Sequence, residues 1–171
     1  MASAQAALAG EPIRWVRVEI LHLTLRFLGE SAPTALDQVQ LAAVDRATSW
    51  RPFDLQLRGL GCFPDGQRPR IVWAGAFDDS GTLARLAEDL ERIAREGGFP
   101  AEERRFSAHL TIGRVKDRIS ADGTRRLAEL IQRSANESYG IVPVRSIELF
   151  QSDLRSTGPI YTRMATMDLS G

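Results

Sequence analysis

The two histidines of the chain each begin a copy of one short pattern. The first copy is His22-Leu23-Thr24-Leu25 and the second is His109-Leu110-Thr111-Ile112. The histidine side chain changes charge close to neutral pH, so two imidazoles can act as an acid and a base in one reaction. In a β-strand, residues i and i+2 point to the same side, which would place each threonine hydroxyl beside its histidine. We therefore expect the two motifs to supply two proton-transfer groups and two neutral hydrogen-bond donors.

A single histidine in an apolar segment is more often an ordinary packing residue than a catalytic one. Here both histidines are followed by leucine, threonine and an aliphatic residue, and this repetition favours a shared chemical role. Two histidines and one cysteine do not make a usual zinc ligand set, so we expect neither a metal nor another cofactor. The sequence also lacks Gly-x-Ser-x-Gly and the phosphate-loop patterns, which leaves acid–base chemistry.

The composition predicts an ordinary intracellular domain. The chain has 171 residues, of which 43% are hydrophobic and 26% are charged. Basic and acidic residues number 22 each, so no net charge attracts the chain to nucleic acid or to a membrane. Cys62 is the single cysteine, which is typical of a reducing compartment, and no apolar run approaches the roughly 18 residues of a membrane span. We expect a cytoplasmic protein without a membrane partner.

The periodicity of apolar residues predicts alternating strands and helices. Ser31 is the expected N-cap of the first helix, and each His-x-Thr motif is expected in a strand. The predicted strands are residues 13–18, 21–28, 52–59, 70–77, 106–115, 141–150 and 159–168, and the predicted helices are 31–49, 81–96 and 120–133.

The order of these elements repeats along the chain. The two motifs lie 87 positions apart, and the two strands after each motif recur at an offset of 89. Such a constant offset indicates an internal duplication. We predict one α+β domain over residues 1–171, with two pseudo-symmetric lobes built around 13–62 and 104–150 with exchanged strands. Each lobe is expected to be an antiparallel sheet with helices on its outer face, and the two lobes to surround a central cleft.

The repeat also predicts a strand and a helix before the first motif. Residues 70–77 and 81–96 provide this unit before the second motif, whereas only residues 3–10 are available before the first. We therefore expect a strand–helix unit to be missing at the N-terminus, either through truncation or as a natural variant.

The two motifs resemble those of the two-histidine (2H) phosphoesterase superfamily. More narrowly, the chain is similar to the 2′-5′ RNA ligase family, described as RNA 2′,3′-cyclic phosphodiesterases. The similarity extends from about residue 13 to the C-terminus. Its further matches are Arg14–Val16, Leu23–Glu30, Gly59–Pro64, Arg68–Trp73, Arg114–Lys116 and Gly158–Thr162.

This resemblance implies a function and roles for the motif residues. It implies hydrolysis, without a metal, of a 2′,3′-cyclic phosphate at an RNA end or on a nucleotide to a 2′-phosphomonoester, with reversible 2′-5′ RNA ligation in addition. His22 would be the general acid and His109 the base that activates water, while Thr24 and Thr111 would bind the phosphate. We expect RNA ends or 2′,3′-cyclic nucleotides as partners, and a monomer. The alternative is a non-catalytic module that binds RNA or a nucleotide in the same cleft, although binding alone would not require two titratable groups.

Phe27 and Arg114 each stand five residues after a histidine. The resemblance implies that Phe27 stacks on the base of the substrate and that Arg114 binds its phosphate. Strict alternation along a strand would turn both away from the histidines, so a bulge or a strand end must redirect them. The three tryptophans, Trp15, Trp50 and Trp73, are expected to serve in packing rather than in binding bases.

Overall fold

The computed structural model describes residues 1–155 and 158–171, and the side chains of these except residues 154, 155 and 158. Contacts between Cα atoms divide the chain into two units, each built from three separate segments. Unit 1 comprises residues 1–25, 55–80 and 106–142. Unit 2 comprises residues 26–54, 81–105 and 143–171.

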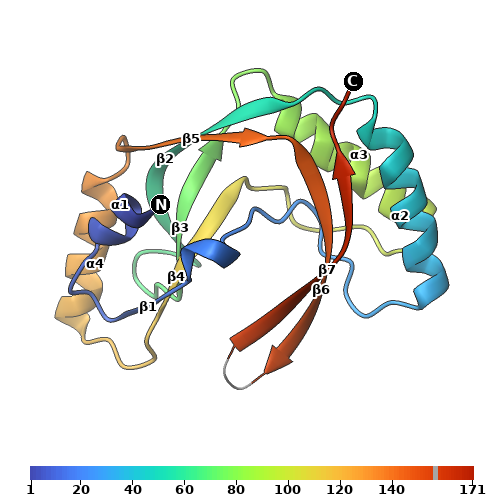
Figure 1. The fold of residues 1–171 in the computed structure, drawn as a ribbon. Coiled ribbons are helices and arrows are strands. Elements are labelled where there is room, and N and C mark those ends of the chain that lie inside the picture. The colour runs from blue at the N-terminus through green and yellow to red at the C-terminus, as the bar shows by residue number, and fades with distance from the viewer. Residues whose placement is uncertain (156–157) are drawn as a thin grey trace. The chain divides into compact units, whose positions relative to one another are not determined.

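Unit 1 is built on a five-stranded sheet in the order β1-β4-β3-β2-β5 (Figure 1). Strand β4 lies between β1 and β3 and is antiparallel to both, and β2 is antiparallel to β3. The strands are β1 (Ile13–Trp15), β2 (Phe53–Phe63), β3 (Ile71–Phe77), β4 (His109–Val115) and β5 (Ser138–Val144).

One face of this sheet is apolar because every second residue of its strands is apolar and points to that side. Helices α1 (Ala2–Ala6) and α4 (Ala121–Arg133) contribute to the core on that face (Figure 1). Helix α4 begins at Ser120, whose hydroxyl oxygen accepts a hydrogen bond from the Gly123 N–H at 3.1 Å. Each fully buried leucine or isoleucine contributes about 1.5–3 kcal/mol. The fully buried residues of this core are Ala4, Leu8, Val72, Ala74, Ile112 and Leu127.

The strand predicted for residues 21–28 is wrong. In this segment only Leu23 forms a bridge, to Leu110 of β4. The strand predicted for 13–18 is also shorter, since Val18–Ile20 form a 3-10 helix after β1. Strand β4 has seven residues, and β1 already pairs with the last three of them, which leaves little edge for a second long partner. Beyond the bridge, Arg26 forms ion pairs outside the sheet, so the chain does not continue along β4.

Unit 2 combines two helices with an antiparallel pair of strands. Helix α2 (Pro33–Ala47) contacts helix α3 (Thr82–Glu96) and strand β7 (Gly158–Asp168), which pairs antiparallel with β6 (Ser146–Arg155) (Figure 1). The N-cap of α2 is Ala32, so the predicted cap at Ser31 is wrong. The Ser31 hydroxyl instead donates to the Gly29 carbonyl oxygen at 3.1 Å. The buried cluster between α2 and α3 contains Val39, Ile93, Ala94 and Phe99.

The strand predicted for 141–150 is divided between β5 and β6, with Arg145 between them. The alternation of side chains does not reveal this change of sheet because β-type periodicity continues on both sides of Arg145. Strand β6 extends to Arg155, further than predicted, and residues 156–157 of the connection between the last two predicted strands lie outside the described residues. The prediction of an α+β fold with antiparallel sheets and helices is confirmed. The lobes around 13–62 and 104–150 stay a prediction.

Candidate active site

Strand β4 carries the second motif near the middle of the unit 1 sheet (Figure 1). Its residues Leu110 and Ile112 are buried on the apolar face. Because side chains alternate along a strand, His109 and Thr111 point to the other face, where both are half-buried. We call this second side of the unit 1 sheet the histidine face.

An antiparallel bridge brings the first motif to the edge of β4. The bridge joins Leu23 and Leu110, the residues between histidine and threonine in the two motifs. In an antiparallel pair, the residues next to a bridge face one another, so each histidine lies across from the threonine of the other motif. The two histidines are then diagonal neighbours, whose Cα atoms are about 7–8 Å apart in such a pair. The bridge therefore brings the two motifs side by side within unit 1.

Each imidazole makes a hydrogen bond of the same kind, to the backbone carbonyl oxygen two residues before it. The Nδ1 atom of His22 lies 2.9 Å from the carbonyl oxygen of Ile20, and that of His109 lies 2.7 Å from the carbonyl oxygen of Ser107. A carbonyl oxygen can only accept a hydrogen bond, so Nδ1 carries the proton in both rings. Nε2 is then the nitrogen that can gain or lose a proton at each motif.

A β-bulge in β4 redirects Arg114. The register of the ladder with β3 shifts by one residue in the middle of β4. Ile112 and Val115 consequently both pack against the core of unit 1, although they are three positions apart. Arg114, between them and exposed, therefore lies on the histidine face together with His109. The structure thus contains a bulge of the kind that the sequence analysis required to turn Arg114 toward the side of His109.

Two aromatic rings of unit 1 border His109. The Phe63 ring meets the imidazole nearly perpendicularly, with ring centroids 5.0 Å apart, and the Trp73 ring lies 6.1 Å away. Phe63 and Trp73 also contact one another at 5.4 Å. The Trp73 indole occupies the space that a side chain at position 61 would fill, so Gly61 allows the ring to lie against β2. Together with the Nδ1 hydrogen bond, these contacts restrict rotation of the His109 ring.

Phe27, the other predicted pocket residue, belongs to unit 2. This residue is 69% exposed, and its carbonyl oxygen accepts a hydrogen bond from Nη1 of Arg26. The Arg26 side chain is only 10% exposed and forms ion pairs with Glu91, at 2.6 Å, and with Glu102, at 3.7 Å. Phe27 thus follows a firmly anchored residue and presents its ring to solvent.

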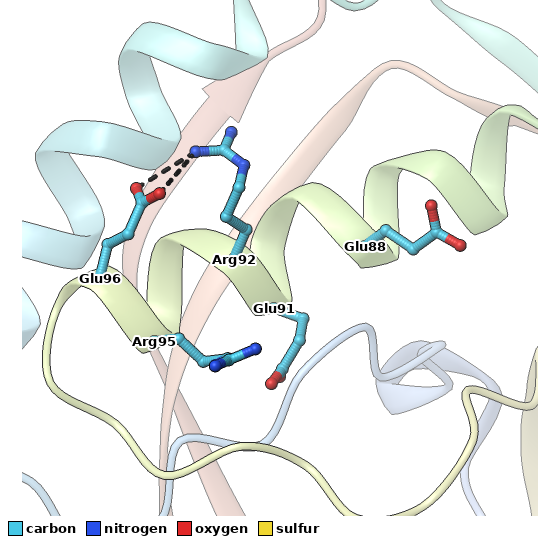
Figure 2. A pocket seen from close by; sticks show the side chains of 5 residues that line it. All are labelled: Glu88, Glu91, Arg92, Arg95 and Glu96. Carbon is cyan, nitrogen blue, oxygen red and sulfur yellow. Dashed lines mark hydrogen bonds and ion pairs between the residues drawn. The ribbon is translucent and has the colours of Figure 1, made fainter.

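A hollow on helix α3 of unit 2 is lined by charged side chains (Figure 2). Nη1 of Arg92 donates to both carboxylate oxygens of Glu96, at 3.0 and 3.1 Å. Three acidic and two basic side chains give this lining a net negative charge, which disfavours a phosphate ligand. The lining residues are Glu88, Glu91, Arg92, Arg95 and Glu96.

Cys62 is poorly suited to act as a nucleophile. Burial, reinforced by the nearby charge of Asp65, raises the pKa of its thiol, which keeps it protonated at neutral pH. Over residues 1–155 and 158–171, no group of three or more histidine, cysteine, aspartate and glutamate side chains is placed to hold a metal ion. Within the same residues, no helix is long and apolar enough to cross a bilayer.

Comparison with known proteins identifies the family. The family model described as LigT like Phosphoesterase matches residues 1–73 and 77–161. The chain belongs to the LigT-like phosphoesterase family. The resemblance stated for the two motifs is thereby confirmed. Relatives named RNA 2′,3′-cyclic phosphodiesterase likewise confirm the prediction of an enzyme of the phosphodiesterase type.

Several curated members of the LigT-like family are similar over most of their length. A protein of Aeropyrum pernix named RNA 2′,3′-cyclic phosphodiesterase is 39% identical over 89% of this chain and 84% of its own. A protein of the same name from Aquifex aeolicus is 34% identical over 92% of this chain and 82% of its own.

Solved structures support the same fold. The crystal structure of TT0787 of Thermus thermophilus has a TM-score of 0.81 and 29% identity, and covers 99% of this chain and 90% of its own. Escherichia coli LigT complexed with 3′-AMP has a TM-score of 0.72 at 23% identity, and covers 99% of this chain and 88% of its own. The second comparison concerns the fold alone.

Sequence reasoning missed three parts of the site. It assigned no role to Phe63, although the segment Gly59–Pro64 contributed to the family resemblance. It also missed the carbonyl groups of Ile20 and Ser107, because every residue has such a group and only the folded backbone shows which ones face an imidazole. No pattern of side chains in the sequence would have revealed these two carbonyl groups.

Proposed function

We propose that this LigT-like phosphoesterase hydrolyses the 2′,3′-cyclic phosphate of an RNA end or a nucleotide to a 2′-phosphomonoester, using two histidines and no metal. The names of the relatives from Aeropyrum pernix and Aquifex aeolicus support this substrate class. The 3′-AMP bound to Escherichia coli LigT is consistent with a nucleotide phosphate as ligand. The observation that carries the mechanism is the Leu23–Leu110 bridge, because it sets the two His-x-Thr motifs against one another.

In the proposed reaction, one bond forms and one breaks at phosphorus. His109, through Nε2, removes a proton from a water molecule whose oxygen attacks the phosphorus atom. The bond between phosphorus and the 3′ oxygen breaks, and His22 donates a proton to that leaving oxygen. The product carries a 2′-phosphate and a free 3′-hydroxyl. Each proton transfer of this kind contributes about 10²–10⁴-fold to the rate.

The two threonines and Arg114 would stabilise the charge on the phosphate. Thr24 and Thr111 carry hydroxyl donors next to the opposing histidines, and such donors are most effective where negative charge develops in the transition state. Arg114 lies on the histidine face through the bulge in β4 and would bind a non-bridging oxygen with its guanidinium. Phe27 would stack on the base, a role that its exposed ring permits.

A 5′-hydroxyl of a second RNA in place of water would join the two ends through a 2′-5′ bond. The same acid and base would serve, because the attacking group is again an oxygen that loses a proton. A mixture of cyclic-phosphate-ended RNA with an excess of 5′-hydroxyl RNA should therefore yield a longer product, whose new junction alone resists a nuclease specific for 3′-5′ bonds.

The test is hydrolysis of 2′,3′-cyclic AMP and of cyclic-phosphate-ended RNA by the full chain in the presence of a chelator. We expect a 2′-phosphate product and a bell-shaped dependence of the rate on pH, because one imidazole must be charged and the other neutral. His22→Ala and His109→Ala should each lower kcat by about 10²–10⁴-fold. Thr111→Val should lower it strongly, whereas the matched control Thr111→Ser keeps the hydroxyl and most of the activity.

Three results would contradict the proposal. These are loss of the wild-type activity on addition of chelator, activity that survives either histidine substitution, and binding of nucleotides by the folded chain without any turnover. The last result would instead support the non-catalytic binding module.

A further inference from the structure

Arg58 lies on the histidine face, one strand beyond β3. Arg58 of β2 is directly opposite Gly75 of β3, and Gly75 is directly opposite His109 of β4. Residues that face one another across antiparallel strands share a side of the sheet, so all three lie on the histidine face. Two strand spacings separate Arg58 from His109, or about 10 Å.

Phe77 fills the space above the glycine in this row. A Cβ atom on Gly75 would lie 2.8 Å from Cε2 of Phe77, so the phenyl ring takes the place of the missing side chain. The guanidinium carbon of Arg58 lies 4.6 Å from the centroid of that ring, a cation–π arrangement. Phe77 is 42% exposed and Arg58 is exposed too, so the stacked pair is open to solvent.

The charge of Arg58 is available to a ligand. No carboxylate of the described residues lies within ion-pair distance of its guanidinium. The nearby acids of the β3–α3 connection are engaged in local hydrogen bonds. Asp78 accepts from the N–H and the hydroxyl of Ser80, and Asp79 accepts from the Gln56 amide at 3.3 Å. An exposed aromatic ring under such a guanidinium is suited to a nucleobase, which stacks on either plane, and to a phosphate, which binds the N–H groups.

We propose that Arg58 and Phe77 bind the nucleotide that precedes the cyclic-phosphate end of a single-stranded RNA. The base stacks on the Arg58–Phe77 pair, and the phosphate linking this nucleotide to the terminal one contacts the Arg58 guanidinium. Arg58 is about two strand spacings from His109, so this subsite adjoins the phosphate held at the motifs without overlapping it. This subsite rests on the proposed function for its reaction, and it makes an RNA end a better ligand than a mononucleotide.

The test is a binding measurement, so that it remains informative even if the proposed function fails. The probes are a fluorescently labelled tetranucleotide RNA with a 3′-phosphate and the corresponding mononucleoside 3′-phosphate, neither of which contains a cyclic ester. We expect Arg58→Ala and Phe77→Ala each to lower the ratio of tetranucleotide to mononucleotide affinity by about tenfold, the size of one lost base stack. An unchanged ratio in both variants would overturn the subsite.

The salt dependence of the affinity separates base stacking from the phosphate contact. Each phosphate contact to a single strand contributes about 0.7 to the slope of log affinity against log salt concentration. Arg58→Ala should therefore reduce that slope by about 0.7 for the tetranucleotide, whereas Arg58→Lys and Phe77→Ala should leave it close to the wild-type slope. A slope that Arg58→Ala does not change would contradict the phosphate contact.

A matched control is Arg125→Ala. Arg125 is an exposed arginine of the same unit, but it lies on helix α4, which packs on the other face of the sheet, and it pairs with Asp122. It should keep the wild-type affinity ratio and salt slope. If this control behaves like Arg58→Ala, the effect is one of net charge and not of a subsite. If the wild type and the variants bind RNA as predicted but the wild type does not hydrolyse a cyclic phosphate, the proposed function fails and the subsite stands.

Discussion

At the scale of single residues, the site depends on how each imidazole is oriented. The carbonyl oxygens of Ile20 and Ser107 fix the proton on Nδ1 of His22 and His109, so the same tautomer is presented twice. His109 is further restricted by contact with the rings of Phe63 and Trp73. The arrangement of these two rings depends in turn on Gly61, which leaves room for the Trp73 indole.

Gly61→Ala should disturb this arrangement. The new Cβ would overlap the Trp73 indole, which must move and thereby loosen the ring contacts of His109. We expect a loss of about 1–3 kcal/mol in unfolding free energy, typical of an overpacked position, and a lower kcat. Urea unfolding and steady-state kinetics measure the two effects. Gly66→Ala is the matched control, because its Cβ would meet its nearest neighbour, Cβ of Ala128, at an ordinary 3.5 Å. Equal behaviour of the two variants would show that Trp73 does not depend on Gly61.

At the scale of elements, strand β4 carries the second motif of the proposed site, and two helices stabilise unit 2. The bulge in β4 gives one strand two functions, since it buries Ile112 and Val115 while it turns Arg114 to the side of His109. In unit 2, Arg46 of α2 binds Asp89 of α3 at 2.6 Å. This ion pair links the two helices across the cluster that contains Val39 and Ile93.

The Asp89 contact should make stability depend on pH. Burial tends to raise the pKa of Asp89, but hydrogen bonds and charges from Arg46 and Arg92 outweigh it, and the pKa lies below the ordinary carboxyl value. A lowered pKa in the folded state stabilises the protein above the unfolded value of about 3.9, and this contribution is lost as the pH falls through the folded value. Since Arg46 is partly exposed, the contribution at pH 7 should be about 0.5–1 kcal/mol.

Denaturant unfolding of Asp89→Asn at pH 7 and in acid measures this effect. The substitution should destabilise the protein at pH 7, and the difference from the wild type should shrink once the pH falls below the folded-state pKa. Asp45→Asn, which changes an exposed carboxylate of α2, is the control and should have a small effect. A destabilisation by Asp89→Asn that is the same at both pH values would contradict the electrostatic explanation.

At the scale of the whole molecule, the chain alternates between the two units. Each unit takes three of the six consecutive segments, so neither can be cut out as one continuous fragment. The chain passes from one unit to the other five times. Unfolding of one unit therefore frees the ends of the segments that build the other. We therefore expect the two units to unfold in a single transition.

The tryptophans allow this to be measured. Trp15 and Trp73 lie in unit 1 and Trp50 lies in unit 2, so Trp50→Phe restricts the fluorescence signal to unit 1. Thermal unfolding followed by fluorescence of that variant should coincide with its unfolding followed by far-ultraviolet circular dichroism, which reports on both units. Two separate midpoints would show that the units unfold independently.

Local patterns were sufficient for the types of most elements. The alternation in residues 70–77 and the apolar stripe in 81–96 predicted β3 and α3 almost to their ends, because burial of one side is imposed by the residues themselves. The same rule failed for residues 21–28, whose apolar alternation is real but whose backbone pairs at Leu23 alone. Periodicity reports which side chains are buried and does not report which backbone groups find a partner strand.

The sequence by itself determined the candidate reactive groups, the family and the α+β class, because residue identity and local periodicity carry that information. The tertiary structure alone decided which groups meet. The bridge between Leu23 and Leu110, the bulge before Arg114 and the row from Arg58 to His109 each join segments distant along the chain. Register between such strands is set by the packing of the whole sheet against α1 and α4, and a shift of one residue would move the histidines to the other face.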